Sequence, residues 1–195
     1  SHSICDSVLR IATTVLWKSP DFRNSNDDME PIIKDSTHIM VYPMCNDYRI
    51  IDFDIILKSM QDEIRIGGSE DKKGYGGFSL RLRLSDSVKF KGLYGNVVPA
   101  VTAVEAGPLL DITNLIKGEN NVLIIQHPEN PGFTQPWILR REQSMQNVVY
   151  PGRTPVSLPK NRPQRLRYRL ILHETEFNSA QLKQFYETYS QKKTF

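Results

Sequence analysis

The sequence predicts a mostly β protein, an antiparallel β-sandwich with one C-terminal α-helix. Three observations lead to this prediction: apolar residues recur at every second position, turn-forming residues separate these segments, and a helical period occurs only near the C-terminus. With 195 residues, the chain is long enough for one well-buried core and short for two. We therefore expect a single domain over residues 1–195, with the sandwich at 3–176 and the helix at 178–191.

Three segments, residues 49–60, 76–84 and 164–174, show the clearest alternation of a half-buried strand. The positions expected to face the core are Ile51, Phe53, Ile55 and Leu57, then Phe78, Leu80, Leu82 and Leu84, then Leu166, Tyr168, Leu170 and Leu172. Asp52 and Asp54 then fall on the opposite face of the first strand. Weaker strands are expected at residues 7–17, 37–43, 62–68, 100–106 and 121–127.

The terminal helix has both a start signal and an apolar stripe. Asn178 or Ser179 can cap its first turn. The stripe at helical spacing consists of Leu182, Phe185, Tyr186 and Tyr189. We expect this helix to pack against the sandwich.

Composition argues against several classes of partner. Lys and Arg outnumber Asp and Glu by only 25 to 22, too little for a phosphate-attracting field, so we expect no nucleic-acid partner. No apolar run approaches the roughly 20 residues of a membrane helix, which predicts no membrane span. Cys5 and Cys45 have no metal-type spacing and allow at most one disulfide. We expect neither a metal nor a cofactor.

The glycine-rich stretch at residues 66–80 superficially suggests a phosphate loop. It lacks the Gly-Lys-Ser/Thr ending and precedes a strand rather than a helix. A solvated, hairpin-like loop between the segments 62–68 and 76–84 is the better interpretation.

The segment "HPENPGFTQPWILR", residues 127–140, is the strongest candidate for a site. Its three prolines fix φ and remove backbone donors, so it is expected to be a rigid loop at a sheet edge. Trp137 then offers a flat face to a sugar ring, and Arg140 offers a fork of donors. In the competing structural interpretation, Trp137 fills the core, His127 satisfies a buried carbonyl, and Arg140 pairs with a glutamate.

Four segments, "IDFDIIL", "IGGSEDKKGYGGFSLRL", "HPENPGFTQPWILR" and "PVSLPKNRPQRLRYRLILHE", occur in the order and approximate spacing of a known family. In them the chain resembles the bacterial PmoA-like family of unknown function, from about Trp17 to Tyr189. The resemblance implies a galactose-mutarotase-like β-sandwich associated with polysaccharide utilisation, and hence a saccharide as the ligand.

The chain also departs from that family. Nothing before Trp17 matches its N-terminal portion, which carries paired histidines and an Arg-Gly, so the resemblance covers the later portion of the family only. The aromatic and Asn-Pro-Phe-like segment after the tryptophan is replaced by "SMQNVVYPG", in which Asn147 and Tyr150 are the nearest equivalents.

If the protein is a catalyst, His127 and Glu105 are the best candidates, since moving a sugar proton requires a histidine that titrates near neutrality and a carboxylate within reach. Glu129 is an alternative partner of His127. The ligand-binding candidates are Trp137, Arg140, Glu129 and Asn130. No metal-binding residues are expected.

Three functions remain open at this point. The first is a carbohydrate-associated sandwich that binds or processes a saccharide. The second is an enzyme, either a glycoside hydrolase of xylanase type or a sugar epimerase, that uses a His/carboxylate pair. The third is a non-enzymatic interaction module in which a polar sheet face meets an acidic partner or a second copy, forming a homo-oligomer. That face carries Arg81, Arg83, Arg165, Arg167 and Arg169. A polysaccharide role would favour a periplasmic or secreted location.

Overall fold

Two facing sheets and one helix build the protein, which the computed structural model describes over residues 7–71, 73–116, 120–142 and 145–192. The large sheet has the order β1 (Leu9–Arg23), β2 (Met29–Val41), β3 (Tyr48–Ser59), β13 (Gln164–His173), β9 (Asn121–Gln126), β8 (Leu109–Thr113), β6 (Lys89–Gly92) and β7 (Gly95–Asn96). The second sheet has the order β10 (Trp137–Ile138), β11 (Met145–Val149) and β5 (Gly77–Arg81). A small pair joins β12 (Val156–Ser157) to β4 (Arg65–Ile66), and the helix is α1 (Ser179–Ser190). The mostly β, antiparallel fold with one C-terminal helix is confirmed.

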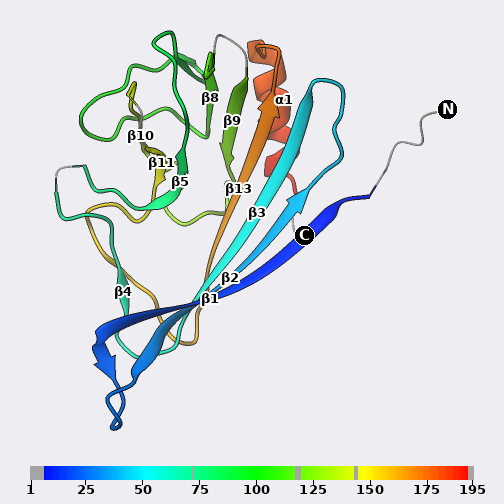
Figure 1. Ribbon diagram of the computed structural model, residues 1–195. Coiled ribbons are helices and arrows are strands. Elements are labelled where there is room, and N and C mark those ends of the chain that lie inside the picture. Colours follow the sequence, from blue (N-terminus) through cyan, green and yellow to red (C-terminus); the bar gives the residue numbers. More distant parts are fainter. Residues whose placement is uncertain (1–6, 72, 117–119, 143–144, 193–195) are drawn as a thin grey trace.

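The large sheet is covered on both faces in its middle (Figure 1). Its inner face, which we define by Leu166, Tyr168 and Leu170 of β13, packs against the three-stranded sheet. Its outer face packs against α1 through Ile171 and neighbouring strands. Because β9 lies between these two layers, all six of its residues are buried. This explains why its four central residues, 122–125, are all apolar and do not alternate.

The strands predicted at residues 49–60 and 164–174 are confirmed, whereas the one predicted at 76–84 ends at Arg81. Leu172, expected to face the core, is instead 40% exposed near the end of β13. Ile55 pairs with Leu166 and Phe53 with Tyr168 on the inner face, while Asp52 and Asp54 lie on the outer face. Strands β3 and β13 therefore follow the period-2 pattern of their sequence.

The helix begins at Ser179 and is capped by Asn178, one of the two predicted caps. The Asn178 side chain accepts from the Gln181 backbone N–H at 3.0 Å, and the Gln181 side chain accepts from the Asn178 N–H at 2.9 Å. This reciprocal arrangement is a capping box. Leu182 and Tyr189 are buried against the outer face of the sheet.

Two predicted elements are wrong. Residues 100–106 form no strand and make a single bridge, between Val104 and Trp137. The glycine-rich stretch is not a hairpin, because β4 pairs with β12 whereas β5 pairs with β11. Its glycines pack closely: a Cβ at Gly77, where φ is +94°, would lie 2.4 Å from the Val148 carbonyl oxygen.

Strand β1 is an open edge of the large sheet. It pairs with β2 on one side, and most of its residues are exposed on both faces. Its exposed large apolar residues are Leu9, Ile11, Val15, Leu16 and Trp17. In the described part of the chain, no helix has the length and apolarity needed to cross a membrane. Cys45 is an exposed free thiol, and Cys5 lies outside the described residues.

Candidate functional site

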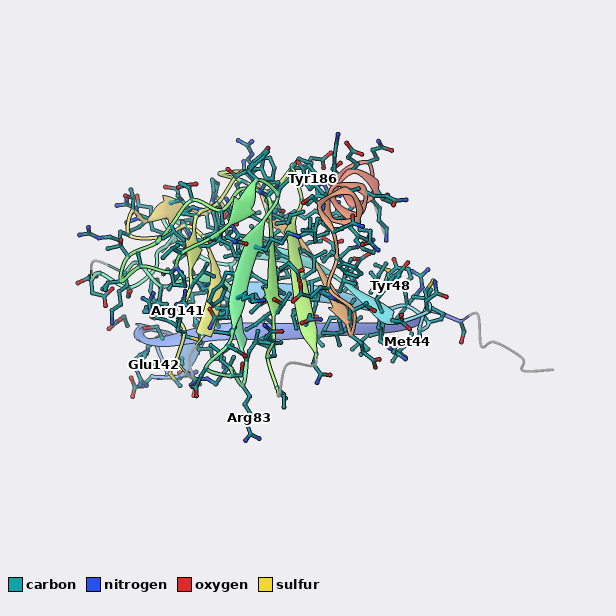
Figure 2. All side chains as sticks on the ribbon, turned by 90° about the horizontal axis from the view of Figure 1, so that it is seen from above. Met44, Tyr48, Arg83, Arg141, Glu142 and Tyr186 are labelled. Carbon is teal, nitrogen blue, oxygen red and sulfur yellow. The ribbon has the colours of Figure 1, made fainter. Side chains whose placement is uncertain are left out.

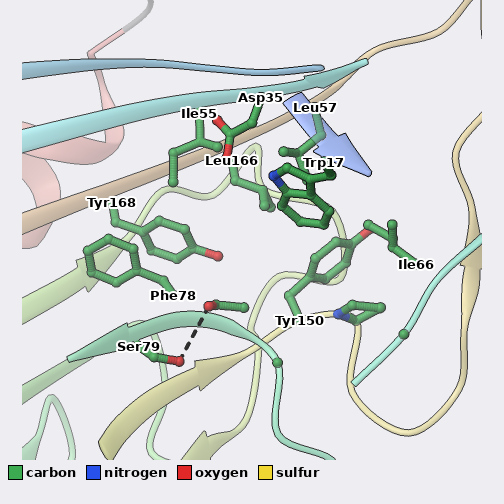
Figure 3. Close-up of a pocket in the computed structure, with 14 residues that line it drawn as sticks. Trp17, Asp35, Ile55, Leu57, Ile66, Phe78, Ser79, Tyr150, Leu166 and Tyr168 are labelled. Carbon is green, nitrogen blue, oxygen red and sulfur yellow. Dashed lines mark hydrogen bonds between the residues drawn. The ribbon is translucent and has the colours of Figure 1, made fainter. Parts of the chain in front are cut away.

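A pocket of about 330 Å³ lies between the inner face of the large sheet and strand β5. Aromatic side chains form much of its wall: Trp17, Phe78, Tyr150 and Tyr168. Figure 3 shows Trp17 and Asp35 on one side of the hollow and Tyr150 and Ser79 on the other. The volume is at the lower end of the range for small-molecule sites, roughly 300–1,000 Å³.

The strand pattern explains how these residues meet. Ile55 and Leu57 of β3 and Leu166 of β13 point inward from neighbouring strands and form the pocket floor. Asp35 pairs with Leu57 across β2 and β3, which places its carboxylate on the same face. Trp17 reaches the pocket from β1. Side chains far apart in the sequence therefore converge because their strands share one face.

The tyrosine hydroxyls of the pocket are neutral donors and acceptors. The Tyr168 hydroxyl donates to Gln135 Oε1 at 3.0 Å, and burial raises the pKa of this phenol well above its usual range. Burial also raises the pKa of Tyr150, whose hydroxyl accepts a hydrogen bond from Gln164 Nε2. Both phenols therefore stay protonated at neutral pH.

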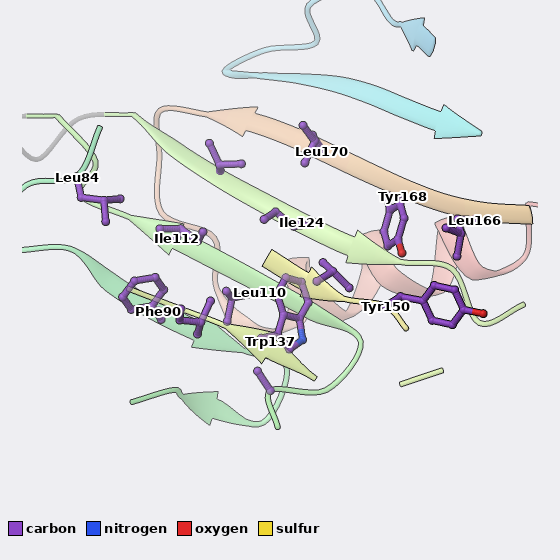
Figure 4. Close-up of a cluster of buried hydrophobic side chains, with 14 of the residues drawn as sticks. Leu84, Phe90, Leu110, Ile112, Ile124, Trp137, Tyr150, Leu166, Tyr168 and Leu170 are labelled. Carbon is purple, nitrogen blue, oxygen red and sulfur yellow. The ribbon is translucent and has the colours of Figure 1, made fainter. Parts of the chain in front are cut away.

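The candidate residues predicted at 127–140 do not share one hollow, although Glu129 and Pro131 border a separate depression. Trp137 is fully buried in the core, and its Nε1 donates to the Gly107 carbonyl at 3.0 Å. Figure 4 shows its ring among apolar neighbours such as Leu110. Arg140 instead lies over the ring of Tyr75, with its guanidinium carbon 5.6 Å from the ring centroid.

Arg140 is held by backbone carbonyls rather than by a glutamate. Its guanidinium donates to Ala100 O and Leu139 O, both at 2.8 Å, and to Val101 O at 3.0 Å. Exposed Glu105 borders a different depression, lined in part by Tyr94. Neither residue lines the aromatic pocket.

His127 lies elsewhere again, beneath the C-terminal end of α1. Its Nδ1 accepts from the Glu129 backbone N–H at 3.2 Å, so Nε2 carries the proton and donates to the Lys192 carbonyl at 3.0 Å. The ring is almost fully buried and packs edge-on against Tyr189. Burial, followed by the charge of Arg167, lowers the pKa of His127. The neutral imidazole therefore links its loop to the residues at the end of α1 and has a structural role.

Asn130 and Glu129 complete this structural role. The buried Asn130 side chain accepts from the Arg167 N–H at 2.7 Å and donates to the Arg167 carbonyl at 2.8 Å. It acts as a strand partner where Pro128 and Pro131 have no N–H to donate. The exposed Glu129 carboxylate pairs with the Arg167 guanidinium. The structure thus brings together His127, Glu129 and Asn130 but not Trp137, Arg140 or Glu105, and the prediction of one shared hollow is wrong.

Comparison with known proteins gives one match. The model of a family of unknown function (DUF6807) matches residues 5–187. The chain belongs to this family. No curated protein and no solved structure gives a significant match.

The DUF6807 chain also contains an internal charge layer that its sequence did not reveal. On the outer face, Asp52 accepts from Arg169 at 2.6 and 2.8 Å and from Lys192 at 2.8 Å, and Asp54 accepts from Arg165 at 2.7 and 2.6 Å. The sequence did contain a signal of this layer: acidic residues alternate along β3 and basic residues alternate along β13. The signal could be used only once the pairing of β3 with β13 was known.

These ion pairs show that the arginines do not form the single polar face that the sequence suggested. Arg167 and Arg169 are buried, and the carboxylates of Glu129 and Asp52 meet them within the chain. Arg81 and Arg83 are exposed, and Figure 2 shows Arg83 projecting from the body of the protein. The five arginines therefore do not form one surface in this DUF6807 member.

Sequence reasoning missed Trp17 and Asp35 as pocket residues of the DUF6807 chain. Asp35 was a detectable signal, because the inner face of β2 otherwise carries Ile33, Thr37 and Ile39. A carboxylate there interrupts a row that is otherwise uncharged. The pocket thus combines aromatic surface with one anionic acceptor, a chemistry suited to binding a small polar ligand.

Proposed function

We propose that this protein binds a saccharide in the aromatic pocket between Trp17 and Tyr150. The observation that carries the proposal is the pocket itself, which has four aromatic side chains, a carboxylate and about 330 Å³ of space. The C–H faces of a sugar pack on aromatic rings, while its hydroxyls donate to carboxylate and carbonyl oxygens. The resemblance of four segments to the PmoA-like family supports the same ligand class.

Binding is favoured over hydrolysis by the composition of the pocket wall. Canonical glycoside hydrolysis uses two carboxylates on opposite sides of the bond. Among the residues that line this pocket, Asp35 is the one carboxylate, and no histidine is present. The pair His127 and Glu105 does not supply the missing groups, because neither residue lines the pocket. A hydrolase or epimerase activity remains an alternative to be tested by product formation.

The two tryptophans of the chain make a direct test possible. Trp17 lines the pocket and is 41% exposed, whereas Trp137 is 0% exposed in the core. In a Trp137→Phe variant, Trp17 is the remaining tryptophan, and its emission should change when mono- and oligosaccharides are added. In the Trp17→Phe variant, Trp137 is the reporter and no change is expected.

Calorimetry provides the affinity measurement. Trp17→Ala is expected to weaken saccharide binding by about tenfold or more, since it removes a stacking face. Tyr94→Ala is the matched control, because Tyr94 is 86% exposed and does not line this pocket. Equal weakening in both variants, or unchanged affinity in a folded Trp17→Ala protein, would refute the proposed site.

A further inference from the structure

We infer that the saccharide bound in this pocket carries a protonated amine, that is, an amino sugar with a free amino group. The inference rests on the proposed function and names the substrate class of the same pocket. It is drawn from the charge of the pocket wall and from the arrangement of its aromatic rings.

The wall of the pocket carries a single charge. Asp35 is the one charged residue among those lining the pocket. Its Oδ1 accepts from Thr37 Oγ1 at 2.8 Å. No Lys, Arg or His lies within ion-pair distance of Asp35 in the described part of the chain. The carboxylate therefore presents a negative charge beside an apolar hollow, where an opposite charge from a ligand is favoured.

Two buried carboxylates of the outer face are paired with cations of the chain itself. Asp52 meets both Arg169 and Lys192, and Asp54 meets Arg165. Those charges are compensated internally. Asp35 differs because its compensating cation is not among the described residues of the protein, which points to the ligand.

The aromatic rings of the pocket can also attract a cation. Cations are attracted to the faces of Trp, Tyr and Phe within about 6 Å, and cages of such rings recognise ammonium groups. Within the described residues, the cation–ring contacts of the protein itself use Tyr42, Tyr75 and Tyr189. Among the described residues, no cation of the protein lies over the rings of Trp17 and Tyr150, which line the pocket.

The charge of Asp35 and the ring of Trp17 together should discriminate among sugars. A hexosamine with a free amine offers an ammonium to Asp35 and a ring face to Trp17. An N-acetylated hexosamine or a neutral hexose offers the ring face alone. A uronic acid places a second negative charge near Asp35 and is disfavoured.

The test is calorimetry with glucosamine, N-acetylglucosamine, glucose, glucuronate and tetramethylammonium at low salt and mildly acidic pH. Glucosamine is expected to bind about tenfold tighter than glucose or N-acetylglucosamine, and glucuronate is expected to bind most weakly. Asp35→Asn keeps the shape of the side chain and should remove the preference for glucosamine over glucose. Asp62→Asn is the control, because Asp62 is an exposed carboxylate outside this pocket that pairs with Lys160 at 3.7 Å.

The outcomes separate this inference from the proposed function. Equal binding of glucosamine and glucose, unchanged by Asp35→Asn, would overturn the amine preference and leave a saccharide site in place. Binding of tetramethylammonium that depends on Asp35, with no sugar bound, would support an ammonium pocket and refute saccharide binding. The absence of any binding would refute both.

Discussion

Replacing Asp52 by Asn should cost this protein a large part of its stability. The Asp52 side chain is fully buried and receives three donated hydrogen bonds, two from Arg169 and one from Lys192. Asn keeps the shape but removes the charge, so the Arg169 guanidinium, whose side chain is 7% exposed, loses its counterion. Removing one partner of a buried pair typically costs about 3–5 kcal/mol.

The structure favours the lower end of that range. The Lys192 side chain is 28% exposed and can regain water, and Arg169 keeps its contact with the Tyr189 ring, 4.5 Å from the centroid. We therefore expect a loss of about 3 kcal/mol in the free energy of unfolding, against a total of roughly 5–15 kcal/mol for a domain. Urea denaturation followed by circular dichroism measures this difference.

The pH dependence gives the prediction a second, independent readout. Burial acts to raise the pKa of Asp52, but the hydrogen bonds and charges of Arg169 and Lys192 outweigh it, so the pKa in the folded protein is lowered. Because the folded-state value lies below the unfolded value of about 3.9, the contribution is fully present above that pH. It is lost as the pH falls through the folded-state pKa. The difference between wild type and Asp52→Asn should therefore shrink in acid.

The control is Asp62→Asn, which breaks a surface pair with Lys160 whose side chains are 84% and 53% exposed. Such pairs contribute about 0–1 kcal/mol. Comparable losses in the two variants, or an Asp52→Asn difference that does not change between neutral and acidic pH, would contradict the reasoning.

Three further predictions follow from the packing. Gly77→Ala should destabilise the protein by more than about 1 kcal/mol and weaken ligand binding, because a Cβ would lie 2.4 Å from Val148 O at a φ of +94°; unfolding curves and calorimetry measure both. Asn178→Ala should cost about 1 kcal/mol in unfolding free energy by removing the α1 cap, whereas exposed Ser179→Ala should cost less. Finally, the open edge of β1 predicts self-association by antiparallel pairing centred on Thr13, which would place Ile11 opposite Val15 and Leu9 opposite Trp17. Ile11→Lys should then lower the association seen by sedimentation velocity, and a wild type that is monomeric at every concentration would refute the pairing.

The sequence predicted the layers of this fold better than their connections. Period-2 alternation assigned the inner faces of β3 and β13 correctly up to Leu170, because these residues pack against the second sheet while the opposite face carries charged residues paired within the chain. The start of β2 was missed, since the strand begins at Met29 and not near Thr37. The reason is physical: Asp35 interrupts the otherwise uncharged row, so the alternation fails at the residue that the pocket uses.

The candidate site could not be found from sequence, because its walls come from non-adjacent strands. Trp17 and Tyr150 are separated by most of the chain and meet only after β1, β2, β3 and β13 have paired in register. The proline-rich loop was instead a strong local signal. Its rigidity serves the fold: Gln126 accepts from the Gln135 N–H and Asn130 from the Arg167 N–H, which replaces the backbone bonds that prolines do not make.

The two tryptophans show why local motifs mislead here. Trp137 lies in a loop-flanked position typical of binding residues, yet β10 pairs with β11 in the covered middle of the protein, so its ring is enclosed. Trp17 lies in an unremarkable strand, yet β1 extends beyond the three-stranded sheet, so its ring borders open space. Whether an aromatic residue binds a ligand is decided by what the opposite layer leaves uncovered. For this fold, the residues to test first are those where the large sheet extends past its cover, with Asp35 and Trp17 foremost.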